Sequence, residues 1–94
     1  MENVSFIRAR IGGATKQFDG RVAWTLHQLF TAGEKGCTPI ENPAPRWSDY
    51  VFKLRGHGVE IETVTEKHGG TYAGHHARYI LRSPVEIIEA KEAA

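Results

Sequence analysis

The sequence contains a single cysteine, Cys37, and no long run of apolar residues. One cysteine excludes an intrachain disulfide, and with it a disulfide-stapled secreted scaffold. The first ten residues lack the apolar stretch of a signal peptide, and no later segment has the roughly 20 consecutive apolar residues that span a bilayer. We therefore expect a cytoplasmic chain with no membrane partner.

The chain also has little net charge, +1 from 12 Lys and Arg against 11 Asp and Glu. Proteins that bind nucleic acids are usually more basic, so the total charge gives that function little support. The charge is unevenly spread, because residues 83–94 sum to −2 and leave +3 for residues 1–82. An acidic end therefore masks a mildly basic body.

Signatures of catalysis are missing too. The sequence has no nucleophile elbow, phosphate-cradling loop or dinucleotide fingerprint. Cys37 lies just before a helix cap with no histidine nearby in sequence, which favours a structural thiol over a nucleophile. Glu60 and Glu62 alternate along an expected strand and should pair with arginines rather than act as acid and base. We expect no enzyme activity and no cofactor.

The composition that is present, 40% apolar and 24% charged in 94 residues, predicts one domain with one modest core, at about residues 20–82. Alternation from Val4 to Ile11 predicts an N-terminal strand within residues 1–13, ended by Gly12-Gly13. Val85 to Ile88 is expected to form another short strand beside it. Residues 89–94 are expected to be a frayed acidic tail.

The most regular pattern follows Asp19, which is a good N-cap for a helix starting near Gly20 or Arg21. Gly33 suits the C-cap. The apolar stripe of this helix is expected to comprise Val22, Leu26, Leu29 and Phe30.

A capping box, Thr38-Pro39-Ile40-Glu41, opens a second helix that cannot continue. The threonine and the glutamate can each accept a free amide of the first turn. Pro43 and Pro45 lack backbone donors and disfavour helical geometry in the residue before them. We therefore expect about one turn of helix here.

A third helix is predicted from Arg46 to Arg55, ending at Gly56. Its buried face should comprise Trp47, Tyr50, Val51 and Leu54. The residues that point elsewhere are Arg46, Ser48, Asp49, Phe52, Lys53 and Arg55. Periodicity places neither Phe52 nor Trp24 in the core, and if both are exposed they mark a protein or dimer interface.

Two strands are predicted after the third helix. Val59, Ile61 and Thr63 alternate with glutamates, which is typical of a strand with one buried face. Its antiparallel partner is expected at 77–82. Between them we expect a long, partly mobile loop with a turn at Gly69-Gly70.

These elements resemble a winged-helix domain of the helix-turn-helix class, and more closely a group of small winged-helix proteins found mainly in bacterial and prophage sequences. The resemblance covers residues 20–82. It is carried by G-C-T-P-I at 36–40, P-R-W-S-D-Y-V-F-K-L-R at 45–55, G-V-E-I-E-T at 58–63, H-G-G at 68–70 and G-H-H-A-R-Y-I-L-R at 74–82. The fold that it implies is α+β, a winged helix-turn-helix with a short second helix, a C-terminal β-hairpin wing and an extra N-terminal strand.

The resemblance implies double-stranded DNA as the partner of a small transcriptional or phage-type regulatory factor. The third helix would enter the major groove and the wing would follow the backbone. Arginine can read guanine or clamp phosphate, and lysine supplies a point charge. The candidate DNA-binding residues are Arg46, Ser48, Asp49, Lys53 and Arg55 on the helix, and Lys67, His68, His75, His76 and Arg78 in the wing.

Two other readings stay open. Many winged helices bind proteins instead, and the low net charge, acidic end and outward Phe52 favour an accessory protein-interaction module, with a homodimer as one form. The wing histidines His68, His75 and His76 also suggest a metal, but neighbouring residues of a strand point to opposite faces. We therefore expect no metal site, and a histidine protonation switch between pH 5 and 7 is the milder alternative.

Overall fold

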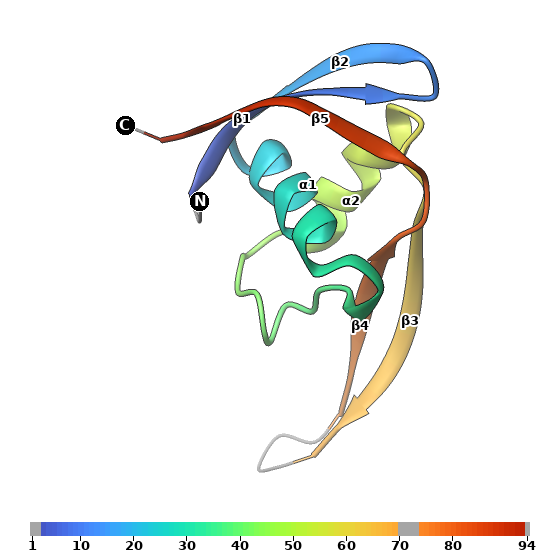
Figure 1. The fold of residues 1–94 in the computed structure, drawn as a ribbon. Helices are drawn as coiled ribbons and strands as arrows, with labels where there is room; N and C mark the ends of the chain where they lie inside the picture. The colour runs from blue at the N-terminus through green and yellow to red at the C-terminus, as the bar shows by residue number, and fades with distance from the viewer. Residues whose placement is uncertain (1–2, 70–73, 94) are drawn as a thin grey trace.

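A computed structural model describes residues 3–69 and 74–93. The elements follow in the order β1 (Val4–Ile11), β2 (Ala14–Asp19), α1 (Gly20–Ala32), the 3₁₀ helix η1 (Gly33–Lys35), α2 (Trp47–Gly56), β3 (Ile61–His68), β4 (Gly74–Leu81) and β5 (Val85–Glu92). The sheet β2-β1-β5 lies over one side of the two α-helices, and the β3-β4 hairpin extends away from them (Figure 1).

The N-terminal strand is present with the predicted bounds, but it continues through a two-residue turn into a strand that the sequence did not suggest. Gly12 and Gly13 both have positive φ, +59° and +85°, which is the geometry of a tight hairpin turn. In β2 only Phe18 is buried, so the apolar alternation that marks a strand is missing. Pairing with β1 forms this strand instead.

β5 confirms the predicted strand beside the N-terminal one but is longer than expected. The expectation that residues 89–94 fray is wrong for residues 89–92, because Glu89, Ala90, Lys91 and Glu92 pair with β1. The Lys91 ammonium also lies 5.3 Å from the centre of the Phe6 ring. The neighbouring strand thus orders a polar segment that has no apolar pattern of its own.

The helix α1 begins at Gly20 as predicted and is capped at its end by Gly33, whose amide donates to the Leu29 carbonyl. Leu26 and Leu29 are fully buried. Two details differ from the expectation. The Asp19 side chain makes no capping hydrogen bond, and Phe30 is 45% exposed rather than part of the buried stripe.

The short second helix is reduced to one hydrogen-bonded turn. The Asn42 amide donates to the Thr38 carbonyl at 2.8 Å, and the Glu41 amide donates to Thr38 Oγ1 at 3.0 Å. This is the threonine half of the predicted capping box. The Glu41 carboxylate lies instead 3.1 Å from Arg78 of β4, so this turn is tied to the hairpin.

The helix α2 carries the predicted buried face, formed by Trp47, Tyr50, Val51 and Leu54. Trp47 stacks on Tyr79 of β4 with ring centres 5.7 Å apart and contacts Trp24 of α1 edge-on at 5.7 Å. Its indole Nε1–H donates to the Asn42 carbonyl at 2.6 Å. Trp24, which periodicity could not place, is thereby packed against the core.

The β3-β4 hairpin is longer than predicted. Pairs run from Ile61–Leu81 to His68–Gly74, so most of the expected loop is strand. Of the expected turn, Gly70 and the three residues after it lie outside the described residues. Thr63, expected on the buried face, is exposed. Cys37 forms an isolated antiparallel bridge with Tyr79, which ties the segment before the reduced second helix to β4.

Gly36 allows the segment that contains Cys37 to approach β4 closely. Its φ is +70°, and a Cβ atom built on it would lie 2.5 Å from the Tyr79 carbonyl oxygen and 2.8 Å from Ile80 Cγ1. Gly33 also has positive φ, +58°, but a Cβ there meets nothing within 4 Å. Substituting alanine at Gly33 therefore introduces backbone strain alone, whereas substituting it at Gly36 introduces both backbone strain and a steric clash.

We predict that Gly36→Ala destabilises the fold much more than Gly33→Ala. The control should cost about 1–3 kcal/mol in backbone strain, because its φ of +58° and ψ of −134° are sparsely populated by residues other than glycine. Gly36→Ala should cost at least about 2 kcal/mol more, because β4 must move away from Cys37. Urea unfolding followed by tryptophan fluorescence measures both free energies. Equal losses would show that the close approach does not matter.

A second prediction concerns Cys37, which is fully buried and whose pKa burial raises to about 11 from 9.0. At about pH 8 the folded protein should react with a disulfide reagent at least about a hundredfold more slowly than the urea-unfolded chain, because the thiolate fraction is lower. The rate should rise as the pH approaches the pKa. Fast labelling of the folded protein would contradict the structural role of this thiol.

Candidate nucleic-acid interface

The outward side of α2, together with its N-cap Arg46, carries five of the ten candidate residues. Arg46, Ser48 and Lys53 are exposed, and Phe52 beside them is 74% exposed. Lys53 forms an ion pair with Asp49 one helical turn away, with nitrogen and oxygen 3.2 Å apart. Exposed pairs of this kind contribute about 0.5 kcal/mol or less, so a stronger anionic partner can displace the carboxylate.

The fifth candidate on this helix, Arg55, has internal partners. Its Nη2 donates to the Ile61 carbonyl at 2.6 Å and to Thr63 Oγ1 at 2.9 Å. These hydrogen bonds fasten the C-terminal end of α2 to β3. The guanidinium therefore fixes the angle between the helix and the hairpin.

The register of the hairpin divides the wing candidates between two faces. Directly paired residues point to the same face, so Lys67 and His75 share a face with Tyr79, the residue that stacks on α2. Both are exposed. His68, His76 and Arg78 have the opposite parity and lie on the other face.

Arg78 joins the wing to the body of the domain. Its Nε donates to Glu66 Oε2 at 2.6 Å, while Nη1 donates to the Lys35 carbonyl at 2.9 Å and lies 3.1 Å from Glu41 Oε1. The hydrogen bond from Arg78 lowers the pKa of Glu66, and the same contact raises the pKa of Arg78. The pair therefore stays ionised and holds the hairpin against the connection between α1 and α2.

The two histidines on this face continue the network. His76 Nε2 lies 3.1 Å from the second oxygen of Glu66, and His76 Nδ1 lies 3.0 Å from His68 Nδ1. The two rings stack with centres 5.2 Å apart. His75, the next residue along the strand, points away from them, as the alternation predicted.

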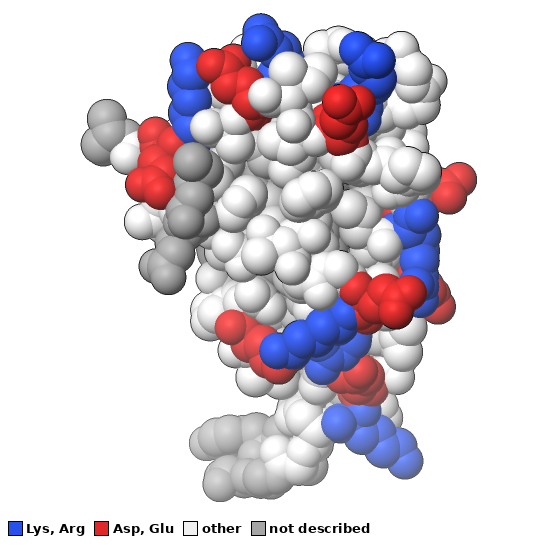
Figure 2. All heavy atoms as spheres, in the orientation of Figure 1, with Lys and Arg blue, Asp and Glu red and all other residues white. Residues whose placement is uncertain are grey.

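The charges on the face drawn in Figure 2 alternate in sign. Lys and Arg side chains lie next to Asp and Glu around its edge, and its centre, over α1 in Figure 1, is largely uncharged. The ion pairs Arg8–Glu89, Arg82–Glu62 and Arg78–Glu66 show that several of the cations of this domain are paired internally. Three candidate cations, Arg46, Lys53 and Lys67, remain available on exposed side chains.

The network contains residues that the sequence analysis did not single out as functional. Glu66 and Glu41 hold Arg78 from positions 12 and 37 residues away, and no local pattern connects them. Outside this network, the sequence analysis also did not single out His27 of α1. The Nδ1 atom of His27 is buried with no hydrogen-bond partner among the described residues, and burial lowers the pKa of this side chain.

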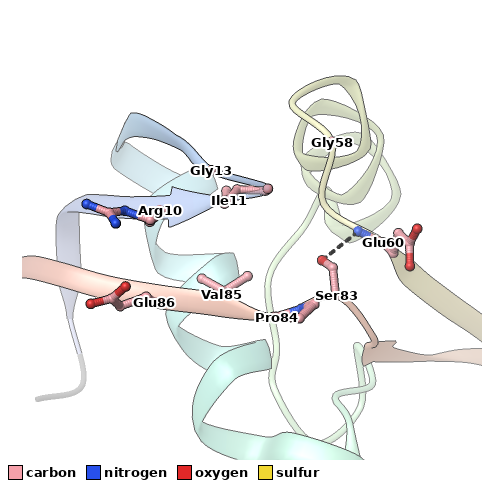
Figure 3. Close-up of a pocket in the computed structure, with 10 residues that line it drawn as sticks. Arg10, Ile11, Gly13, Gly58, Glu60, Ser83, Pro84, Val85 and Glu86 are labelled. Atoms are coloured by element: carbon pink, nitrogen blue, oxygen red, sulfur yellow. Dashed lines mark hydrogen bonds between the residues drawn. The ribbon is translucent and has the colours of Figure 1, made fainter.

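An open pocket of about 600 Å³ lies where the turns before β2, β3 and β5 meet (Figure 3). Of its charged side chains, Arg10 and Glu86 extend to one side from paired strand positions, and Glu60 extends to the other side. Ser83 Oγ accepts a hydrogen bond from the Glu60 amide at 2.9 Å. The glycines and the proline of these turns could have indicated the pocket, but its polar groups do not converge on a common point.

Within residues 3–69 and 74–93, no helix is long and apolar enough to cross a membrane, and no group of three or more His, Cys, Asp or Glu side chains is arranged to hold a metal ion.

Comparison with known protein families identifies one whose model matches this chain. The family model described as "Winged helix domain" matches residues 15–91, from β2 to β5. No curated protein and no solved structure matched the chain. The match covers the helices, the reduced second helix and the complete hairpin, and the chain therefore belongs to the winged helix domain family.

Proposed function

We propose that this domain binds double-stranded DNA with the outward face of α2 and the α2-facing side of the wing. The observation that carries the proposal is that Lys67 and His75 share a sheet face with Tyr79, which stacks on Trp47 of α2. Lys67, His75 and the helix are thus on the same side of the hairpin. A duplex that receives α2 in its major groove would meet the wing tip along its backbone.

The chemistry of the exposed α2 residues suits this role. Arg46 and Ser48 lie at the N-terminal end of the helix, where free amides and the helix dipole favour a phosphate. Lys53 would exchange Asp49 for a phosphate. Asp49, once released, could accept a hydrogen bond from the cytosine amino group, which would add sequence preference.

The other predicted contacts serve a different purpose in this proposal. Arg55 and Arg78 position the helix and the wing, and His68 and His76 belong to the network behind the wing. Only Arg46, Lys53 and Lys67 remain to neutralise phosphates. With about three phosphate contacts, log K should fall with log[salt] with a slope of about −2 to −3. The biological role would be that of a small, non-enzymatic regulatory factor, of the transcriptional or phage type, acting in the cytoplasm.

We predict salt-dependent binding of a mixed-sequence duplex, measured by fluorescence anisotropy. Arg46→Ala, Lys53→Ala and Lys67→Ala should each weaken binding and reduce the salt slope by about 1, because each removes one phosphate contact. Lys91→Ala, which removes one cation from β5, is the matched control and should change neither quantity. Binding that is lost equally in the control, or that has no salt dependence, would refute the proposal.

Phe52 favours a second candidate function, in which α2 contacts a protein, with another copy of this chain as the simplest case. A phenylalanine that is 74% exposed on a helix with few free cations is typical of an interface anchor.

On this alternative, sedimentation equilibrium should show self-association that Phe52→Ala weakens. Ile88→Ala, an exposed apolar residue of β5, is the control and should have no effect. A monomer at all concentrations, together with duplex binding, would leave DNA as the partner.

A further inference from the structure

The back face of the wing presents two imidazole nitrogens to each other. His76 is paired with Glu66 and His68 with Gly74, so the two histidines are diagonal neighbours on one face of adjacent strands. Their Nδ1 atoms are 3.0 Å apart. Gly74 has no side chain, and the nearest His68 ring atom lies 3.5 Å from the position that a Cβ would take there.

Both ring nitrogens of His76 have a hydrogen-bond partner. Glu66 is ionised by its contact with Arg78, so its oxygen 3.1 Å from His76 Nε2 accepts a hydrogen bond from that nitrogen. The other nitrogen, Nδ1, faces Nδ1 of His68 at hydrogen-bond distance, so one proton lies between these two atoms.

We propose that His68 and His76 bind a divalent transition-metal ion, such as Zn²⁺, through their two Nδ1 atoms. The ion replaces the single proton shared by these nitrogens, and that proton leaves to solvent. Two nitrogens bound to tetrahedral zinc at about 2.0–2.1 Å are roughly 3.3 Å apart, a few tenths of an ångström more than the separation here. The ring centres are 5.2 Å apart with the two Nδ1 atoms nearly on the line between them, so both rings must also turn for their lone pairs to converge on the ion.

Glu66 gives this site the outer support of an established zinc-binding arrangement. A histidine that binds a metal through one ring nitrogen usually donates its other N–H to a carboxylate, which orients the ring and makes it more basic. Glu66 is held in turn by Arg78, and Arg78 by Glu41 and the Lys35 carbonyl. The carboxylate is therefore already positioned before an ion arrives.

The site has two protein ligands among the described residues, because no group of three candidate ligands is found there. Water completes the coordination, so the expected affinity is that of an open site rather than of a closed structural one. Imidazole ligands favour Zn²⁺, Cu²⁺ and Ni²⁺ over Mg²⁺ and Ca²⁺, which prefer oxygen. The proposal is independent of DNA binding, which uses the opposite face of the wing.

The test is a ZnCl₂ titration of the full chain, without a histidine tag, followed by calorimetry and by NMR of the imidazole and amide signals. We expect one ion per chain, with the largest shifts at the two histidines. His68→Ala and His76→Ala should each weaken binding at least tenfold, and Glu66→Gln about tenfold. A titration with MgCl₂ should give no comparable shifts.

His75→Ala is the matched control, because it removes the adjacent histidine from the opposite face and should leave zinc affinity unchanged. Thermal melts without metal show whether each variant still folds. If His76→Ala loosens the wing, His68→Ala, which keeps the contact between His76 and Glu66, decides the question. Zinc binding that survives loss of His68, or that depends equally on His75, would overturn the proposal, as would the absence of one-to-one binding.

Discussion

The position of one side chain, the indole of Trp47, holds the parts of this domain together. It stacks on Tyr79 of the hairpin, contacts Trp24 of α1 and donates a hydrogen bond to the carbonyl of Asn42. Helix α1, strand β4 and the turn before α2 thus meet at the first residue of α2. Truncating a buried tryptophan typically costs about 3–5 kcal/mol, and here the loss would also release the angle at which α2 faces outward.

The parts of the fold that the sequence predicted are those with a local cause. The stripe of Leu26 and Leu29 and the α2 face around Trp47 follow the helical period, and Thr38 and Gly33 mark the ends of elements. Strand β2 and the end of β5 have no such cause. They become strands because β1 pairs with them, β2 on one side and β5 on the other. The local sequence pattern of either segment gives no sign of this pairing.

The candidate site was predictable in composition but not in arrangement. Sequence reasoning identified Arg55 and Arg78 as cations of the helix and the wing, yet could not show that both have partners within the domain. Those partners are two backbone carbonyls, a hydroxyl and carboxylates brought close by the tertiary fold. Alternation along the strand did separate His75 from His76, because the side-chain period of a strand is a local property.

The pairing of β1 with β5 has a mechanical consequence. Val4 at the start of β1 lies opposite Glu92 at the end of β5, and both ends of the chain are on the same side of the molecule in Figure 1. Tension applied between these ends would load the hydrogen bonds of the ladder one after another instead of all together. The hydrogen bonds between β1 and β5 would therefore break in sequence from the ends inward. The β3-β4 hairpin belongs to a separate sheet and would not carry this tension directly.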